Sequence, residues 1–196
     1  MIAAEKIKYL QNRIARSEDQ WAYKELFSEF YSYLTRFARS FVRSKELAEE
    51  IVSDVFIKIW EKRSRLEEIT NLKLYLYVAT RNTALNYLER QTKTSTFPID
   101  ELAPELGCLS FDPEQLLITA EMMARIQRAI DALPPKCKMV YKLIKEDQLA
   151  YKEVADIMQI AIKTVENQLA IAIQKISSAI SFDIKRTIPS SLNSSK

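Results

Sequence analysis

The stretch that decides the fold runs from Leu149 to Ile176 and reads LAYKEVADIMQIAIKTVENQLAIAIQKI. Apolar residues in its first part recur at the spacing of one buried helical face: Tyr151, Val154, Ala155 and Met158. After a break at 159–161, a second apolar row contains Val165, Leu169, Ala172 and Ile176, and the opposite side carries Lys163, Asn167, Ala170, Ile171 and Gln174. Two short helices with a polar outer face are typical of a helix-turn-helix, although an ordinary helical hairpin fits the periodicity equally well.

The composition around this stretch predicts an all-α protein. The chain has 196 residues, of which 47% are hydrophobic, so it can fill one core or two small ones. It contains one Gly and six Pro, which leaves few signals for β-turns. Leu, Ile, Ala, Glu and Lys dominate, and these residues favour helices.

Charge and rare residues exclude several classes of function. The net charge is +3, with two mildly basic blocks on either side of an acidic connector at 92–120, which is a weak indication of a nucleic-acid partner. Two cysteines, Cys108 and Cys137, and no histidine cannot supply the four ligands of a Cys/His zinc site. With no histidine and no Gly-rich phosphate loop, we expect neither an enzyme, nor a metal, nor a cofactor, nor a small-molecule substrate. No apolar run approaches about 18 residues and no signal-peptide core is present, so the sequence predicts a soluble, cytoplasmic protein.

The N-terminal half predicts a bundle of helices. A helix over 5–16 would place Ile7, Leu10 and Ile14 on one side, and Ser17 to Gln20 has the pattern of a capping box. The aromatic-rich helix that follows carries Trp21, Leu26, Phe27, Phe30, Leu34, Phe37 and Phe41, which predict a core helix. Ser44 can cap the next helix, whose two apolar rows are Leu47, Ile51, Val55, Ile59 and Ala48, Val52, Phe56, Trp60. Its acidic opposite face, with Glu50, Ser53 and Asp54, is either solvated or docks a basic partner.

The next helix, capped by Thr70 or Asn71, runs to about Arg90 and has two faces of different character. Leu74, Val78, Leu85 and Leu88 predict a core face, and Tyr75, Ala79, Asn82 and Asn86 form a second one. Amides beside an aromatic ring can hydrogen-bond base edges and stack on an unpaired base. Asn82 is equally compatible with a buried amide satisfied inside the core.

Pro, Gly and Ser residues at 91–112 mark a linker, after which Asp112-Pro113-Glu114 starts a helix over about 113–131. Pro135 then begins another helix that leads into the opening stretch. The chain therefore divides into an N-terminal extension (1–19), a first bundle (20–91), a flexible acidic linker (92–112), a second bundle with the helix-turn-helix (113–181) and a C-terminal tail (182–196).

Three strings, in this order, carry a family resemblance: AEEIVSDVFIKIWEKR, NLKLYLYVATRNTALNYLER and LPPKCKMVYKLIKEDQLAYKEVADIMQIAIKTVENQL. The chain resembles RNA polymerase sigma factors of the extracytoplasmic-function type, in the variety common in Bacteroidetes, over about 20–181. The resemblance implies that the first bundle is region 2, which binds the β′ clamp of core RNA polymerase and melts the −10 promoter element. It implies that the second is region 4, which binds the β flap and reads the −35 element of promoter DNA.

The resemblance also implies roles for individual residues. The residues implied to contact polymerase are Glu50, Ser53 and Asp54. Those implied to bind the −10 element are Tyr75, Arg81, Asn82 and Asn86, with a recognition loop at 66–73. Those implied to bind the −35 element are Lys163, Thr164, Glu166, Asn167, Gln168 and Ile171. The acidic linker would approach the RNA-exit path, and an anti-sigma factor is an expected partner.

This chain departs from the family pattern at several positions. Ser53 stands where Gln is usual in the family, so we expect an altered contact with the clamp. Ala150 and Ala161 replace capping residues, and Gln159 occupies a turn position that often holds Gly. Ile171 stands where a basic residue is usual, and an Arg or Lys there would contact a DNA phosphate. We therefore expect a marginally stable second bundle that reads its element weakly. The competing interpretations are a helix-turn-helix regulator that acts without core polymerase and a helical scaffold protein.

Overall fold

In the computed structural model the described residues, 3–92 and 116–187, fold into helices joined by short turns, with no strand among them. The first bundle contains α1 (Ala4–Ser17), α2 (Gln20–Val42), α3 (Lys45–Glu61), the short 3-10 helix η1 (Arg63–Glu68) and α4 (Leu72–Thr92). The second contains α5 (Leu116–Asp131), α6 (Pro135–Lys145), α7 (Tyr151–Met158) and α8 (Ile162–Thr187). The all-α fold with two bundles is confirmed. The predicted linker and the Asp112-Pro113 helix start lie outside the described residues.

The start of α2 corrects the predicted capping box. Ser17 is the last residue of α1, and Asp19 is the N-cap: its Oδ1 accepts hydrogen bonds from the N–H groups of Trp21 at 2.9 Å and Ala22 at 3.1 Å. Because the helix begins at Gln20, Ala22 faces the core and Trp21 is 78% exposed. The prediction that Trp21 belongs to the core row is therefore wrong.

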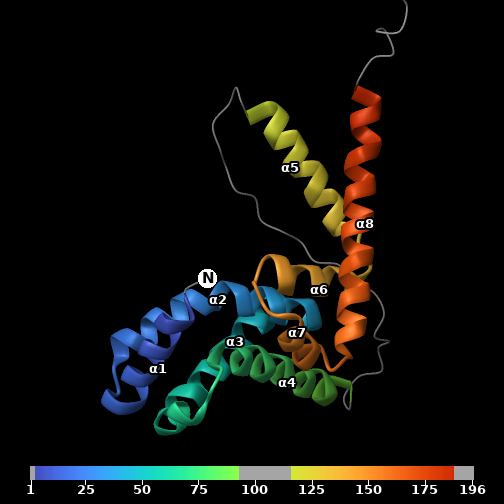
Figure 1. Ribbon diagram of the computed structural model, residues 1–196. Coiled ribbons are helices and arrows are strands. Elements are labelled where there is room, and N and C mark those ends of the chain that lie inside the picture. The colour runs from blue at the N-terminus through green and yellow to red at the C-terminus, as the bar shows by residue number, and fades with distance from the viewer. Residues whose placement is uncertain (1–2, 93–115, 188–196) are drawn as a thin grey trace, which may run out of the picture.

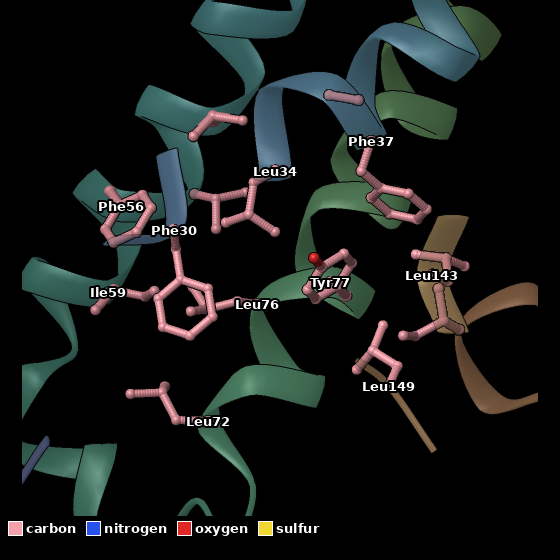
Figure 2. Packing of buried hydrophobic residues seen from close by; sticks show 14 of the residues in the cluster. Phe30, Leu34, Phe37, Phe56, Ile59, Leu72, Leu76, Tyr77, Leu143 and Leu149 are labelled. Atoms are coloured by element: carbon pink, nitrogen blue, oxygen red, sulfur yellow. The ribbon is translucent and has the colours of Figure 1, made fainter. Parts of the chain in front are cut away.

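The core of the first bundle follows the predicted apolar rows elsewhere. Leu26, Phe30 and Leu34 of α2 are fully buried, and the Phe27 ring packs edge-on against Phe56 of α3 with centroids 4.9 Å apart. Phe30 and Leu34 lie among Phe56, Ile59, Leu72 and Leu76 (Figure 2). The predicted helix at 5–16 belongs to the same core, since Ile7, Leu10 and Ile14 of α1 are buried in it. Ser44 caps α3 as expected by accepting from the Leu47 N–H at 3.1 Å.

The two bundles share this core. Leu143 and Leu149 of the second bundle lie beside Phe37 and Tyr77 of the first (Figure 2), and the same buried cluster continues into α7 and α8 through Val154 and Val165. A smaller cluster joins α5, α6 and α8: Ile130, Leu133, Cys137, Ala172 and Ile176. Helices α6 and α7 therefore lie against α2 and α4, while α5 and the far end of α8 project away (Figure 1). None of the described helices is long and apolar enough to cross a membrane.

The stretch from Leu149 to Ile176 forms the two predicted helices, α7 and α8, with a tight turn between them. All four apolar positions of α8, Val165, Leu169, Ala172 and Ile176, are buried, whereas Tyr151 at the start of α7 is 42% exposed, contrary to prediction. Tyr151 is the first residue of α7, and the buried positions of that helix are Val154, Ala155 and Ile157. Gln159 takes the left-handed conformation (φ 56°, ψ 47°) that Gly would adopt without steric cost.

The N-terminus of α7 has half of a capping box. The Glu153 carboxylate accepts from the Ala150 N–H at 2.7 Å, but Ala150 has no side-chain oxygen to return the bond.

We expect Ala150→Ser to complete the box and to stabilise the protein by about 1 kcal/mol. The thermal midpoint of the full chain should rise by about 2–4 °C. The matched control is Ala170→Ser at an exposed interior position of α8, where Ser gains no cap and lowers helix propensity. A midpoint for Ala150→Ser at or below that of the control would contradict this account.

Candidate nucleic-acid and protein interfaces

One face of α4 presents polar groups to solvent. Tyr75 is 41% exposed, and Asn82 and Asn86 are exposed on the same side of the helix; we call these three residues the α4 amide face. The alternative of a buried Asn82 is thereby excluded. Arg81 is half-buried and its Nη1 donates to Asn82 Oδ1 at 3.3 Å, which orients the amide. All four predicted core residues of α4 are only half-buried: Leu74, Val78, Leu85 and Leu88. The fully buried positions of this helix are Leu72, Leu76, Tyr77, Thr80 and Ala84, so the predicted core face is wrong.

The loop that precedes α4 is held from the N-terminal helix. The buried Gln11 amide of α1 donates to the Leu66 carbonyl and, at 2.8 Å, to the Ile69 carbonyl. Asn71 caps α4, since its Oδ1 accepts from the Leu74 N–H at 3.0 Å. Sequence reasoning missed Gln11, although an amide next to the apolar row of α1 was the available signal. Residues 4–17 are therefore a structural part of the first bundle and position the loop at 66–73.

The acidic face of α3 carries the three predicted polymerase-contact residues. Glu50 is exposed, and Asp54 and Ser53 are half-buried. The Ser53 hydroxyl donates to the Glu49 carbonyl one turn earlier at 2.8 Å, so this short side chain is satisfied by its own helix. A glutamine at that position would extend farther from the helix than Ser53 does. The contact available to a partner on this face therefore consists mainly of carboxylates.

The outer face of α8 divides into two groups of predicted residues. Lys163, Thr164, Asn167 and Ile171 are exposed, and Lys163 Nζ pairs with half-buried Glu166 at 2.9 Å. Gln168 differs, because its Oε1 accepts from the buried Cys137 thiol of α6. Burial raises the pKa of Cys137, so this thiol stays protonated and remains a donor. The structure thus brings five predicted residues together near the N-terminal part of α8 and turns Gln168 toward α6.

A buried carboxylate, Asp147, joins the two bundles. It pairs with Arg36 of α2 and accepts from the Tyr77 hydroxyl of α4 at 2.8 Å, while its backbone carbonyl accepts from Lys73 Nζ at 2.8 Å. We call these three bonds the Asp147 contact. Asp147 is 2% exposed; burial raises its pKa, and the Arg36 guanidinium opposes that shift. Sequence reasoning did not find this contact, because its partners are distant along the chain.

A second bond links the helix-turn-helix to the loop before α4. Asn71 Nδ2 donates to Glu153 Oε1 at 2.6 Å. Lys73 additionally donates to the Gln148 carbonyl at 3.1 Å, and burial lowers the pKa of its ammonium group. The predicted recognition loop is therefore one of the parts of the first bundle that bind the second, together with Arg36 and Tyr77.

Comparison with known proteins matches both bundles to one family. Residues 26–94 match sigma-70 region 2, and residues 123–176 match sigma-70 region 4. The chain is 26% identical over 175 residues to the ECF RNA polymerase sigma-E factor of Escherichia coli K12, covering 86% of this chain and 91% of the relative. It is 22% identical over 188 residues to the RNA polymerase sigma-H factor of Pseudomonas aeruginosa, covering 92% and 96%. The narrower resemblance to the Bacteroidetes variety stays a prediction.

Two solved structures have a similar fold. One is CnrH in complex with the cytosolic domain of CnrY, with 18% identity, a TM-score of 0.53, and coverage of 91% of this chain and 99% of that chain. The other is the sigma factor RpoE of Bartonella quintana in complex with the anti-sigma factor NepR, with 20% identity, a TM-score of 0.54, and coverage of 82% and 97%. At these identities the two structures support the fold alone.

Replacing Gln11 by Leu keeps the size of the side chain and removes its donor. We expect Gln11→Leu to leave the buried Leu66 and half-buried Ile69 carbonyls without this donor and to lower stability by about 1–3 kcal/mol. The loop at 66–73 should also exchange its amide hydrogens faster, as measured by hydrogen exchange. Asn12→Leu, on the same helix but outside these bonds, is the control. Unchanged exchange in that loop would show that Gln11 does not hold it.

Replacing Asp147 by Ala leaves Arg36 and the buried Tyr77 hydroxyl without their shared acceptor. We expect a loss of about 1–3 kcal/mol in the free energy of unfolding and a larger radius of gyration in small-angle scattering. The control is Glu146→Ala, because Glu146 pairs with Arg36 only at 3.4 Å and at a partly exposed site. That change should cost under about 1 kcal/mol. Equal effects of the two substitutions would contradict the importance of the buried carboxylate.

Proposed function

Because the chain belongs to the sigma-70 family, as an RNA polymerase sigma factor of the extracytoplasmic-function type that acts in transcription initiation, we propose that its two exposed polar faces read the two parts of a promoter. The α4 amide face would bind the −10 element and the outer face of α8 the −35 element. The observation that carries this proposal is the exposure of Asn82 and Asn167 on helices of different bundles. An amide on a helix surface can make paired hydrogen bonds with a base edge.

At the −10 element the proposal requires an unpaired base. Extruding a base from the stack costs a few kcal/mol, and a site offering an aromatic surface with amide donors and acceptors offsets part of that cost. Tyr75 supplies the ring, and Asn82 and Asn86 supply the amides. Arg81, which holds Asn82 at 3.3 Å, also adds positive charge for the phosphate backbone.

At the −35 element α8 would enter the major groove with its N-terminal residues near the bases. Lys163, Thr164 and Asn167 would make direct contacts, and Gln168, bonded to Cys137, would position the helix. Glu166 compensates the Lys163 charge, and Ile171 adds none. Binding should therefore be weak and have a shallow dependence on salt, because few phosphates are neutralised.

The protein partner of the α3 face would be the β′ clamp of core RNA polymerase. Glu50 and Asp54 present carboxylates that complement a basic surface, and complementary charge mainly raises the association rate. The second bundle would bind the β flap.

An anti-sigma factor is a further proposed partner, since solved proteins of similar fold form such complexes. This activity needs no enzyme chemistry, cofactor or small-molecule substrate, and its place would be the cytoplasm, where polymerase and DNA meet.

The alternative is a helix-turn-helix regulator that binds duplex DNA without core polymerase. The two functions differ in a gel-shift assay with and without core enzyme. The sigma-factor proposal expects a specific promoter complex only when core is present. A tight, specific complex with the isolated protein would favour the regulator.

Asn82→Ala should separate promoter opening from polymerase binding. Loss of paired hydrogen bonds to one base costs about 1–3 kcal/mol, so run-off transcription should fall roughly tenfold or more. Affinity for core polymerase should stay unchanged, because that contact is proposed for α3. Asn12→Ala, a half-buried amide of α1, is the control and should keep full transcription. Unchanged run-off product from Asn82→Ala would exclude Asn82 from the −10 site.

A further inference from the structure

A cavity of about 60 Å³ opens at the boundary of the two bundles, between α2 and α6. Five of its lining side chains are basic: Arg36, Arg39, Arg43, Lys138 and Lys142. Its apolar part consists of Phe37, Pro135, Met139 and Leu143, and its lining also includes Ser40 and Asp147. None of these residues belongs to the faces proposed to contact DNA or the β′ clamp, so the promoter function leaves this cluster unexplained.

The burial of Lys142 is the observation that most strongly indicates an anion in this cavity. The residue is only 8% exposed, and its Nζ is buried without a hydrogen-bond partner among the described residues. Burial lowers the pKa of this ammonium group; the nearby Glu146 carboxylate opposes that shift, and the cations Arg36 and Lys138 reinforce it. A buried charge is costly unless it is paired, so the site favours an anion beside Lys142.

The nearby carboxylates already have other partners. Asp147 is engaged by Arg36 and by the Tyr77 hydroxyl, and Asp131 pairs with Lys138 Nζ at 3.2 Å. The Ser40 hydroxyl donates to the Phe37 carbonyl at 2.6 Å. Glu146 lies near Lys142 and pairs with Arg36 at 3.4 Å, but it makes no hydrogen bond to Lys142 Nζ. Among the described residues Lys142 Nζ therefore has no bonded anion, which leaves a place for an anion from outside the protein.

We infer that this cavity binds a phosphate group, either as a free phosphate or pyrophosphate or as the end of a nucleotide. A space of about 60 Å³ holds several water-sized probes, which suits one phosphate better than a peptide segment. Arginine and lysine are the side chains that bind phosphate oxygens most strongly. The apolar part of the lining can contact the remainder of a nucleotide.

A bound phosphate would also join the bundles. Arg36 and Arg39 come from α2, and Arg43 is the C-cap residue that follows it. Lys138 and Lys142 come from α6, so one anion would be attracted to both bundles. An anion that binds the packed bundles more tightly than the separated ones stabilises the contact between the two bundles by mass action. This consequence does not depend on promoter recognition.

The test is calorimetric titration of the full chain with pyrophosphate, a nucleoside triphosphate, inorganic phosphate and citrate, all at one ionic strength. We expect pyrophosphate and the triphosphate to bind with one site per chain and to raise the thermal midpoint, and citrate to bind at least about tenfold more weakly. Tighter binding of the triphosphate than of pyrophosphate would identify a nucleotide; equal binding would identify the free anion. Equal binding of citrate would overturn the assignment to phosphate.

Variants locate the site. Lys142→Met should weaken pyrophosphate binding at least about tenfold, because a charge-assisted bond is lost. The same change should raise the midpoint of the unliganded protein, since an unpaired buried charge is removed. Arg43→Gln, at the exposed rim, provides a second variant and should weaken binding severalfold without a change in fold.

The matched control is Lys152→Met on α7, which removes the same charge at an exposed position outside the cavity. It should leave the pyrophosphate affinity within about twofold of the original. Equal affinities in Lys142→Met, Arg43→Gln and the unaltered chain would overturn the proposal. A loss of affinity in Lys152→Met as large as that in Lys142→Met would also overturn it, because it would indicate non-specific charge attraction.

Discussion

The Asp147 carboxylate is the polar constraint on which the arrangement of the two bundles depends. It lies two residues after the end of α6 and bonds to Arg36 of α2 and Tyr77 of α4. The surrounding core includes Phe37, Leu143 and Leu149. Apolar contacts supply most of the attraction between the bundles but little orientation, because the hydrophobic effect has no direction. The hydrogen bonds of a buried carboxylate have strict geometry, and each one left unmade is costly. They therefore select one packing among several of similar buried area.

This constraint bears on the proposed promoter contacts. Lys73 and Asn71 belong to the loop that would approach the −10 element, yet here they bind Asp147, Gln148 and Glu153. An ammonium group that donates to two carbonyls keeps only one of its three N–H donors for a phosphate of DNA. The α4 amide face and the outer face of α8 remain exposed in the same arrangement. The two faces proposed to read bases are thus open to solvent, while the loop between Leu66 and Lys73 takes part in the contact between the bundles.

Local sequence signals predicted the helices well and their surroundings less well. The buried row of α8 and the two rows of α3 follow from helical periodicity, since a side chain every three or four residues returns to the same face. Trp21 was placed wrongly because the true cap, Asp19, shifts the face that meets the core. Gln168 was expected to face outward with its neighbours. Instead its amide oxygen accepts a hydrogen bond from the thiol of Cys137, which is distant along the chain, and the side chain turns toward α6. Gln11 was missed because its two carbonyl acceptors lie at Leu66 and Ile69.

The sequence by itself determined the all-α class, the two bundles, the helix-turn-helix and the family, because each depends on residue spacing within a helix or on short strings of residues. The sequence also indicated the turn position of Gln159 and the missing cap at Ala150, because turns and caps depend on neighbouring residues. Only the tertiary structure decided that the bundles share a core and that Asp147 is buried against Arg36 and Tyr77. It also decided that Lys142 lines a cationic cavity with no hydrogen-bond partner for its Nζ among the described residues. Those features depend on which distant side chains become neighbours, and burial then determines the free energy of each charge.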